Sequence, residues 1–251
     1  MENPSSPIPN YLSIISKTRD LLYILNDLVM ANHLIEVKGK GDSHLDRLAP
    51  ELIVNIVSHL PNLKSVLTFS STAHKYRTII IENQRTIVRN LAATILEDDD
   101  PEVIRLAFLA CNATLIEYPD YRGVRKFIKK YVNPAEKGSD IYNFRALSLM
   151  RGLSVNVEIL LDWTATYATL WPLKLSDKAY TATEITRMRR IIYLVETGFR
   201  LLYAIPEPGL RKLADRFWRS FPLWDVDRAY AYMRMISCTD WKCKYSDHKT
   251  Y

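Results

Sequence analysis

The chain has 251 residues, of which 48% are hydrophobic, so it can bury a sizeable core and does not have the composition of a disordered tail. It contains only seven glycines, and no stretch has the glycine spacing of a dinucleotide fold or a phosphate-binding loop, which argues against nucleotide chemistry. The formal net charge is +6, and three scattered cysteines are too few for a disulfide framework, which excludes the small disulfide-stabilised secreted proteins.

Helix-forming residues dominate and alternating apolar and polar runs are rare, so the sequence predicts an all-α fold, with the strand-like LIEV at 34–37 as the main exception. The first residues, MENPSSPIP, do not have the basic and apolar composition of a secretory signal. The oily stretch 11–30 is no ordinary membrane span, because it is interrupted by Lys17, Arg19, Asp20 and Asp27. We therefore expect a cytoplasmic or nuclear protein without a membrane partner.

The N-terminal part divides into three segments. Residues 1–10 are rich in proline and serine, which predicts disorder. Residues 11–37 predict an amphipathic helix, and its apolar positions between 11 and 29 recur close to a heptad spacing. This helix either packs on the rest of the chain or mediates self-association. Residues 38–43 contain two glycines and predict a linker.

A short helix with clear end signals follows the linker. Pro50 fits the first helical turn, Glu51 complements the helix dipole there, and Pro61 cannot continue the helix, which predicts a helix from about Pro50 to Leu60. One apolar stripe is expected on it, formed by Leu52, Ile53, Ile56, Val57 and Leu60. Additional apolar residues, Leu45, Leu48 and Val54, are not explained by that stripe.

Two more short helices are predicted before residue 82. Asn62 can cap a helix that carries Leu63, Val66 and Leu67 on one face, and the hydroxyls of residues 70–72 favour a break. The third helix would turn Tyr76, Ile79 and Ile80 inward. Three helices of this length bury too little apolar surface to stand alone, so either a partner or the rest of the chain must cover them.

This segment, residues 44–82, resembles an F-box of the fungal type. The family pattern is Leu-Pro-x-Glu-Leu, then an isoleucine and a leucine, then a Leu/Ser-rich helix that ends near Arg-x-Trp-Arg. The matching residues are Leu45, Leu48, Pro50, Glu51, Leu52, Ile56, Leu60, Leu63, Val66, Leu67, Ser70, Lys75, Tyr76 and Arg77. Two positions depart from the pattern: Ala49 stands where the family has proline, and Tyr76 stands where tryptophan is common.

The resemblance implies a substrate-recognition adaptor of a Skp–cullin–F-box ubiquitin ligase. In that role residues 83–251 would form a helical target-binding domain, and the chain would need neither a catalytic group nor a cofactor. The residues implied to bind the Skp-type subunit are Leu45, Leu48, Pro50, Glu51, Leu52, Ile56, Leu60, Leu63, Val66 and Leu67. The alternative is a free-standing helical protein that binds other proteins or nucleic acid through a degenerate F-box.

Further helices are predicted in the C-terminal part. Asp100 is expected to cap a helix that begins at Pro101 and turns one face inward, with the acidic run serving as a cap and not as a metal site. The inward residues would be Ile104, Ala107, Phe108, Cys111 and Leu115. Thr181 and Glu184 form a candidate capping box, and the helix after them would turn Ile185, Met188, Ile192, Val195 and Phe199 inward.

The excess of positive charge lies near the C-terminus: residues 1–140 hold 17 basic and 17 acidic side chains, whereas residues 181–251 hold 13 and 8. The RMRR run, 187–190, suits a solvated face, an acidic partner or nucleic acid. Aromatic residues cluster between 217 and 232, as a core or as a recognition groove. The candidate target-facing residues are Arg187, Arg190, Trp218 and Trp224.

Sequence signals for enzyme or metal chemistry are weak. The sequence GDSH, 41–44, is similar to the block that carries the nucleophilic serine in GDS-type esterases. No second block of that family is present, so a serine in a linker is the simpler interpretation. Cys238, Cys243 and His248 provide three zinc ligands where a structural site needs four. No internal repeat of 20 to 50 residues is present. We therefore predict a protein that is not an enzyme and that holds no metal.

Overall fold

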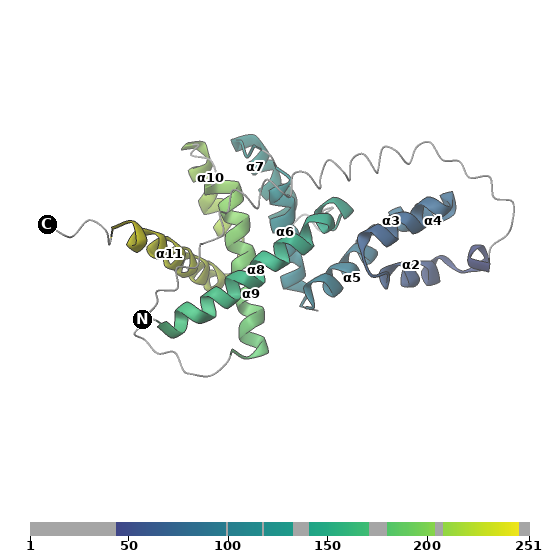
Figure 1. The fold of residues 1–251 in the computed structure, drawn as a ribbon. Helices are drawn as coiled ribbons and strands as arrows, with labels where there is room; N and C mark the ends of the chain where they lie inside the picture. The colour runs from purple at the N-terminus through teal and green to yellow at the C-terminus, as the bar shows by residue number, and fades with distance from the viewer. Residues whose placement is uncertain are drawn as a thin grey trace.

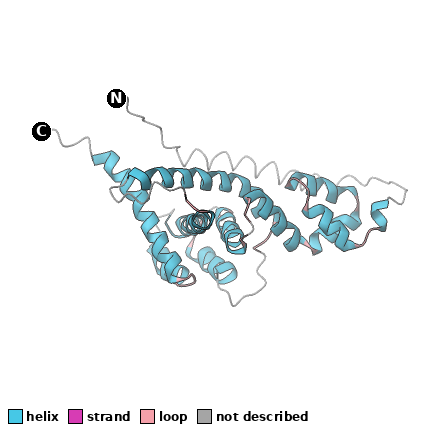
Figure 2. Ribbon diagram, turned by 90° about the horizontal axis from the view of Figure 1, so that it is seen from below, coloured by secondary structure: helices cyan, strands magenta, loops and turns pink. Residues whose placement is uncertain are grey.

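A computed structural model describes residues 44–98, 100–116, 118–132, 141–170, 180–203 and 208–245 (Figure 1). Within these ranges the chain forms ten α-helices and no strands, which confirms the predicted all-α class (Figure 2). Several predictions lie outside the described residues: the helix at 11–37 with its self-association face, the strand-like LIEV, the linker serine and His248.

The first three helices lie at one end of the molecule, and the fourth lies between them and the rest of the protein (Figure 1). A 3-10 turn, η2 (His44–Arg47), precedes α2 (Pro50–Ser58), α3 (Leu63–Thr72), α4 (His74–Glu82) and α5 (Gln84–Leu96). The predicted end signals are confirmed: Pro50 opens α2, and the Asn62 side chain caps α3 by accepting a 2.9 Å hydrogen bond from the Ser65 N–H. The end of α3 coincides with the three predicted hydroxyls, each of which donates to a carbonyl three residues earlier.

The remaining helices form the body of the protein. Along the chain they are α6 (Pro101–Thr114), α7 (Tyr121–Phe127) with its π-helical extension η3 (Ile128–Val132), α8 (Phe144–Leu170), α9 (Ala182–Gly198) with the π-helix η4 (Phe199–Tyr203), α10 (Pro208–Trp218) and α11 (Leu223–Tyr245). The Asp100 cap and the Thr181–Glu184 capping box are both present as predicted. None of the helices in the described ranges is long and apolar enough to cross a membrane.

Helix α6 is the centre of the body. It packs against α9, α8, α5 and η4, and α11 packs against α9. The predicted inward residues are buried except for the half-buried Leu115, but so are the residues on the other faces of α6, including Val103, Leu106, Leu109 and Ala110. The single inward face predicted for this helix was therefore too narrow. A helix that is apolar on all sides is buried on all sides, and the sequence VIRLAFLACNA already has that composition.

A buried amide fixes α6 relative to α8. Asn112 Nδ2 donates to the carbonyls of Phe108, at 2.8 Å, and Ile141, at 3.0 Å. Its Oδ1 accepts a 3.0 Å hydrogen bond from Asn143 Nδ2, and Asn143 in turn caps α8 by accepting from the Ala146 N–H at 2.8 Å. Each polar atom of this buried pair therefore has a partner, as an apolar interior requires.

The helix after the Thr181–Glu184 capping box, α9, differs from its prediction at Phe199, which is exposed and does not point inward. Ile192 and Val195 are buried as expected, and Ile185 and Met188 are half-buried. The helix becomes π-helical at Phe199. The buried residues around it are Thr197, Gly198, Leu201 and Leu202, so the inward face of the helix passes beside Phe199.

Candidate protein-docking surface

The apolar residues of α2 divide between two faces. Ile53 and Val57 are fully buried, and α2 packs through them against α4 and α5. Leu52 and Ile56, one helical turn apart, are 51% and 41% exposed. The single stripe predicted for this helix is therefore two stripes, of which one belongs to the core and the other faces outward.

A third exposed aliphatic residue precedes α2 in the chain, namely Leu45. It lies on η2 and is 38% exposed, whereas Leu48 and Val54 are partly buried against the core. We call the exposed set of Leu45, Leu52 and Ile56 the α2 surface. Leu60, one turn beyond Ile56, leads to a shallow groove of about 430 Å³ along α3, which is also lined by Lys64, Thr68 and Phe69.

The other residues implied to bind a Skp-type subunit differ in accessibility. Pro50 and Glu51 are exposed, and Leu63 and Leu67 are half-buried. Val66 is fully buried between the helices, so its inclusion among the partner-binding residues is corrected: its side chain serves the local core. The sequence pattern cannot make this distinction, because core and docking positions alternate along the same amphipathic helix.

The two departures from the F-box pattern have simple structural consequences. Ala49 precedes Pro50 with φ −64° and ψ 147°, and this φ is the value that a proline ring would impose. Tyr76 is buried, and its ring stacks on Phe69 of α3 with centroids 4.9 Å apart. The backbone at Ala49 is thus compatible with proline, and an aromatic ring still fills the space between α3 and α4.

The candidate target-facing tryptophans are separated by the structure. Trp218 is buried; its ring lies against Gly198 of α9 and Phe217, and its Nε1–H donates to Tyr203 Oη at 3.3 Å. Its assignment as a target-facing residue is corrected, since a buried ring cannot meet a partner. Trp224 is exposed at the start of α11, with the Arg228 guanidinium 4.4 Å above its ring.

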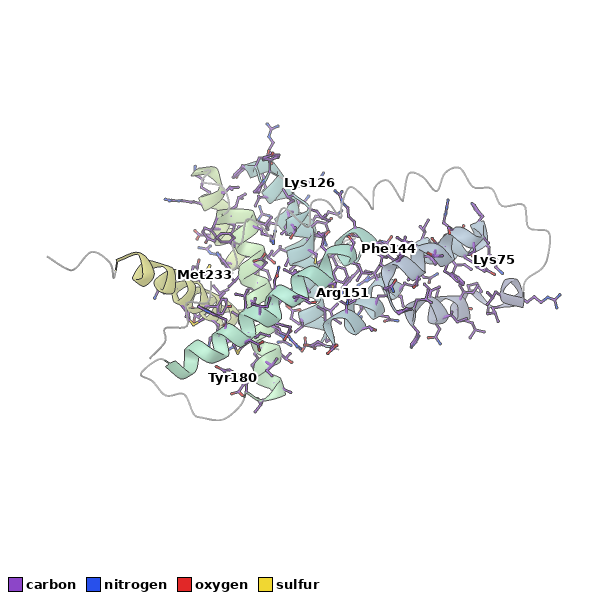
Figure 3. All side chains as sticks on the ribbon, in the orientation of Figure 1. Lys75, Lys126, Phe144, Arg151, Tyr180 and Met233 are labelled. Atoms are coloured by element: carbon purple, nitrogen blue, oxygen red, sulfur yellow. The ribbon has the colours of Figure 1, made fainter. Side chains whose placement is uncertain are left out.

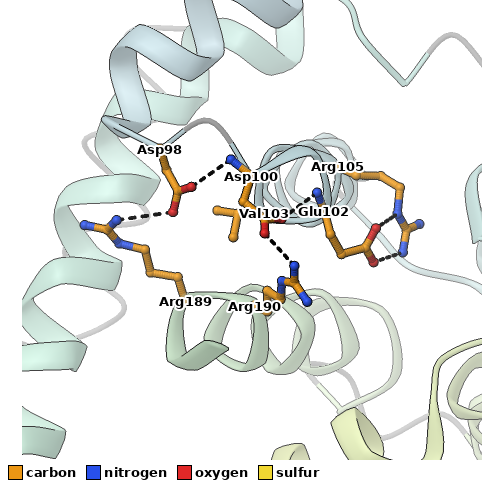
Figure 4. Close-up of polar contacts among 7 residues, drawn as sticks. All are labelled: Asp98, Asp100, Glu102, Val103, Arg105, Arg189 and Arg190. Atoms are coloured by element: carbon orange, nitrogen blue, oxygen red, sulfur yellow. Dashed lines mark hydrogen bonds and ion pairs between the residues drawn. The ribbon is translucent and has the colours of Figure 1, made fainter. Parts of the chain in front are cut away.

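The arginines of the RMRR run largely bind acids of the same chain (Figure 4). Arg189 pairs with Glu158 at 2.9 Å and with Asp98 at 3.3 Å, and Arg190 pairs with Asp100 at 2.5 Å. Arg187 is exposed. Arg190 therefore joins α9 to the start of α6, and its side chain is still 32% exposed, so its role as a target-facing residue stays a prediction.

These contacts also perturb acid ionisation. Burial raises the pKa of the Asp100 carboxyl. Hydrogen bonds from the Val103 N–H, the Arg190 guanidinium and the Glu102 N–H lower it, and together they outweigh the effect of burial, so the pKa lies below the ordinary value of 3.8. The nearby Asp225 behaves in the opposite way: burial raises its pKa, with a smaller raising effect from Glu102, and Arg190 opposes the change. The acidic run thus acts as a cap and an ion-pair partner.

Basic side chains that make no ion pair among the described residues lie on α7 and α10, at positions that were not predicted to be functional: Arg122, Arg125, Lys126, Arg211, Lys212 and Arg216. Residues 118–132 and 208–222 together hold nine lysines and arginines and two acids. The signal was present in the segments YRGVRKFIKKY and LRKLADRFWR, but charge counts over the long ranges 1–140 and 181–251 concealed it.

No group of three or more His, Cys, Asp and Glu side chains suitable for a metal ion occurs among the residues that the structure describes. The side chains of Cys238 and Cys243 are outside that set, although both residues lie within α11. The chain matches no protein-family model, and searches of curated proteins and of solved structures found no similar chain.

Proposed function

We propose that this chain is the substrate-recognition adaptor of a Skp–cullin–F-box ubiquitin ligase, with residues 44–82 as its F-box. In this role the α2 surface docks on the Skp-type subunit, and the helical body presents a target protein for ubiquitin transfer by other subunits. The chain itself then needs no catalytic group and no cofactor. The assembly would operate in the cytoplasm or the nucleus.

The exposure of Leu45, Leu52 and Ile56 carries the proposal. The three side chains come from adjoining turns of η2 and α2, on a segment whose opposite face is buried against α4 and α5. Covering three half-exposed aliphatic side chains is worth roughly 2–4 kcal/mol, which is a substantial part of a specific interface. The family pattern identifies these same three positions as contacts of a Skp-type subunit.

Co-expression with a Skp-type subunit, followed by size-exclusion chromatography, tests the proposal. We expect a stoichiometric complex with the unmodified chain. The double variant Leu52→Asp/Ile56→Asp should abolish it, because two charges would enter a desolvated contact. Since both side chains are exposed in the free chain, the variant should retain its helicity by circular dichroism.

The chain offers a matched control on α8. Val155 and Ile159 have the same spacing and similar exposure, 54% and 49%, but lie on the body. Val155→Asp/Ile159→Asp should therefore leave the complex intact. Equal loss of binding in both double variants would mean that the effect is unspecific, and unchanged binding in both would refute the docking role of α2.

One observation favours the second candidate function, a free-standing helical interaction protein with a degenerate F-box. Helix α2 packs against α5 as well as against α4, so the three short helices are joined to the rest of the chain without any partner. A well-folded chain that never forms a complex with a Skp-type subunit would support this alternative.

A further inference from the structure

We propose that the exposed basic side chains of α7 and α10 form a docking surface for an acidic, partly apolar segment of a partner protein. The proposal names the chemistry of the target for the adaptor role described above, and it rests on that role for its choice of a protein partner. We call this surface the basic face and define it by Arg122, Arg125, Lys126, Arg211, Lys212 and Arg216.

The basic face is formed by two helices that contact each other. Helices α7 and α10 pack against each other and lie side by side, away from α2 (Figure 1). Their inward residues, including Val124, Phe127, Leu213 and Phe217, are buried, which leaves the six basic side chains exposed. Figure 3 shows Lys126 at this end of the molecule. The packing of the two helices therefore gathers charges that are far apart in the sequence.

These charges are not neutralised in the way that the RMRR arginines are. Arg189 and Arg190 bind Asp98, Glu158 and Asp100. Within the part of the chain that the structure describes, the six side chains of the basic face make no ion pair. The only acids of the two surrounding segments, 118–132 and 208–222, are Asp120 and Asp215. Asp120 is already engaged as the cap of α7, where it accepts from the Gly123 N–H at 2.7 Å.

Helix stability does not account for all of these positions. Arg125, Lys126 and Arg216 lie in the last turns of their helices, where the helix dipole favours cations. Arg122, in contrast, lies in the first turn of α7, and Arg211 and Lys212 lie in the N-terminal half of α10. Cations in the first turn of a helix oppose the dipole, so Arg122 and Arg211 have a cost that a bound acidic partner would offset, and the dipole does not favour Lys212.

Neighbouring aromatic residues indicate a polypeptide partner. Tyr203 and Tyr230 are both exposed beside the C-terminal end of α10: Tyr203 Oη accepts from Trp218 Nε1, and the Tyr230 ring lies 5.3 Å from the Trp218 ring. Such rings suit apolar side chains between the acids of a peptide. A nucleic acid strand has regularly spaced phosphates and would bring some of them against Asp120 and Asp215, whereas the acids of a polypeptide can be spaced to avoid both.

Fluorescence anisotropy with the full chain tests the basic face. The probe is a labelled peptide in which glutamates alternate with leucine and phenylalanine, compared with the same peptide carrying lysine for glutamate and with single- and double-stranded DNA. We expect binding of the acidic peptide alone, weakened by salt. Lys126→Glu/Arg211→Glu should reduce the affinity by about tenfold.

The control variant is Arg145→Glu/Arg151→Glu, which makes the same change in net charge at exposed positions of α8. It should bind the peptide as the unmodified chain does; an equal loss would mean attraction to net charge only and would overturn the proposal. Equal or tighter DNA binding with the same variant dependence would identify a nucleic-acid surface instead, and absence of peptide binding would also overturn it. Lys126→Gln/Arg211→Gln repeats the test with a milder change.

Co-purification with a Skp-type subunit is measured on the same variants. Because the basic face lies away from the α2 surface, both charge variants should still form that complex. If peptide binding is lost while the complex still forms, the result bears on the basic face and leaves the adaptor role in place. If the complex fails while the peptide still binds, the result bears on the adaptor role and leaves the basic face in place.

Discussion

Helices α2 and α6 begin with the same two residues, Pro-Glu, at Pro50 and Pro101, and yet their apolar residues have different fates. α6 is surrounded by α9, α8, α5 and η4, and ten of its fourteen residues are buried. α2 buries Ile53, Val57 and Ser58 and leaves Leu52 and Ile56 exposed. Neighbouring residues in the sequence thus determine where a helix starts, whereas the burial of its side chains depends on which helices from other parts of the chain pack against it. The apolar residues that remain uncovered in α2 are available to another molecule.

The largest effect is expected at the centre of α6. Phe108→Ala removes a fully buried ring and should lower the free energy of unfolding by about 3–5 kcal/mol, because the packed neighbours cannot fill the cavity. Ile56→Ala on the exposed face of α2 should change it by only about 0.5 kcal/mol or less. Urea denaturation measures both. A similar decrease in the free energy of unfolding for both variants would contradict the conclusion that α6 is enclosed and that one face of α2 is exposed.

Close packing in the body predicts the next effect. A Cβ at Gly198 of α9 would lie 2.9 Å from the buried Trp218 ring, so Gly198→Ala should destabilise the protein by about 1–3 kcal/mol despite the helix propensity of alanine. Gly152→Ala, at an exposed position of α8, should instead stabilise it by about 0.5–1 kcal/mol. Thermal unfolding distinguishes the two. A higher melting temperature for both variants would show that the Trp218 ring shifts enough to accommodate the added methyl group.

The start of α6 is stabilised by charge, whereas Ala49 at the start of α2 provides no side-chain cap. Asp100→Asn keeps a capping oxygen but removes the carboxylate, and it should cost about 1 kcal/mol at pH 7. The folded pKa of Asp100 is lowered, so its contribution is present above pH 3.8 and disappears as the pH falls through the folded pKa. Denaturation at pH 7 and at successively lower pH should show the difference and then, below the folded pKa, its loss. A difference that persists at the lower pH would assign the effect to the cap geometry alone.

The smallest effect is expected at Ala49, where φ already has the value of proline. Ala49→Pro should raise the melting temperature by about 1–4 °C, because it restricts the unfolded chain without straining the folded one. It should also leave the complex with a Skp-type subunit intact. Ala73→Pro is the matched control: Ala73 precedes α4 with φ −154°, which proline cannot adopt, so this variant should be destabilised. Destabilisation by Ala49→Pro would mean that the family proline does not fit this backbone.

The local features of the fold were predictable from the sequence. Pro50, Asn62, Asp100 and the Thr181–Glu184 pair each stabilise a helix start through contacts within three residues, and a pattern of that length can be read directly. The inward positions Tyr76, Ile79 and Ile80 of α4 were also predicted, since that helix has one clear apolar face.

The features that depend on distant neighbours were not predictable. Arg190 meets Asp100 across about 90 positions of the chain, and no local pattern relates the two. The division of α2 into core and exposed stripes follows from the position of α5, and Phe199 is exposed because the neighbouring helices cover Thr197 and Gly198 instead. For the candidate site, the sequence therefore indicated the segment, and the structure separates its accessible residues from Val66.

The position of α6 also has a consequence for synthesis on the ribosome. Its chief neighbour, α9, begins only at Ala182, so α6 leaves the exit tunnel on the order of ten seconds before α9 is complete. During that interval the apolar side that α9 later covers is open to water and to other nascent chains. We expect chaperones that recognise apolar helices to bind this side of α6 until α9 has been synthesised.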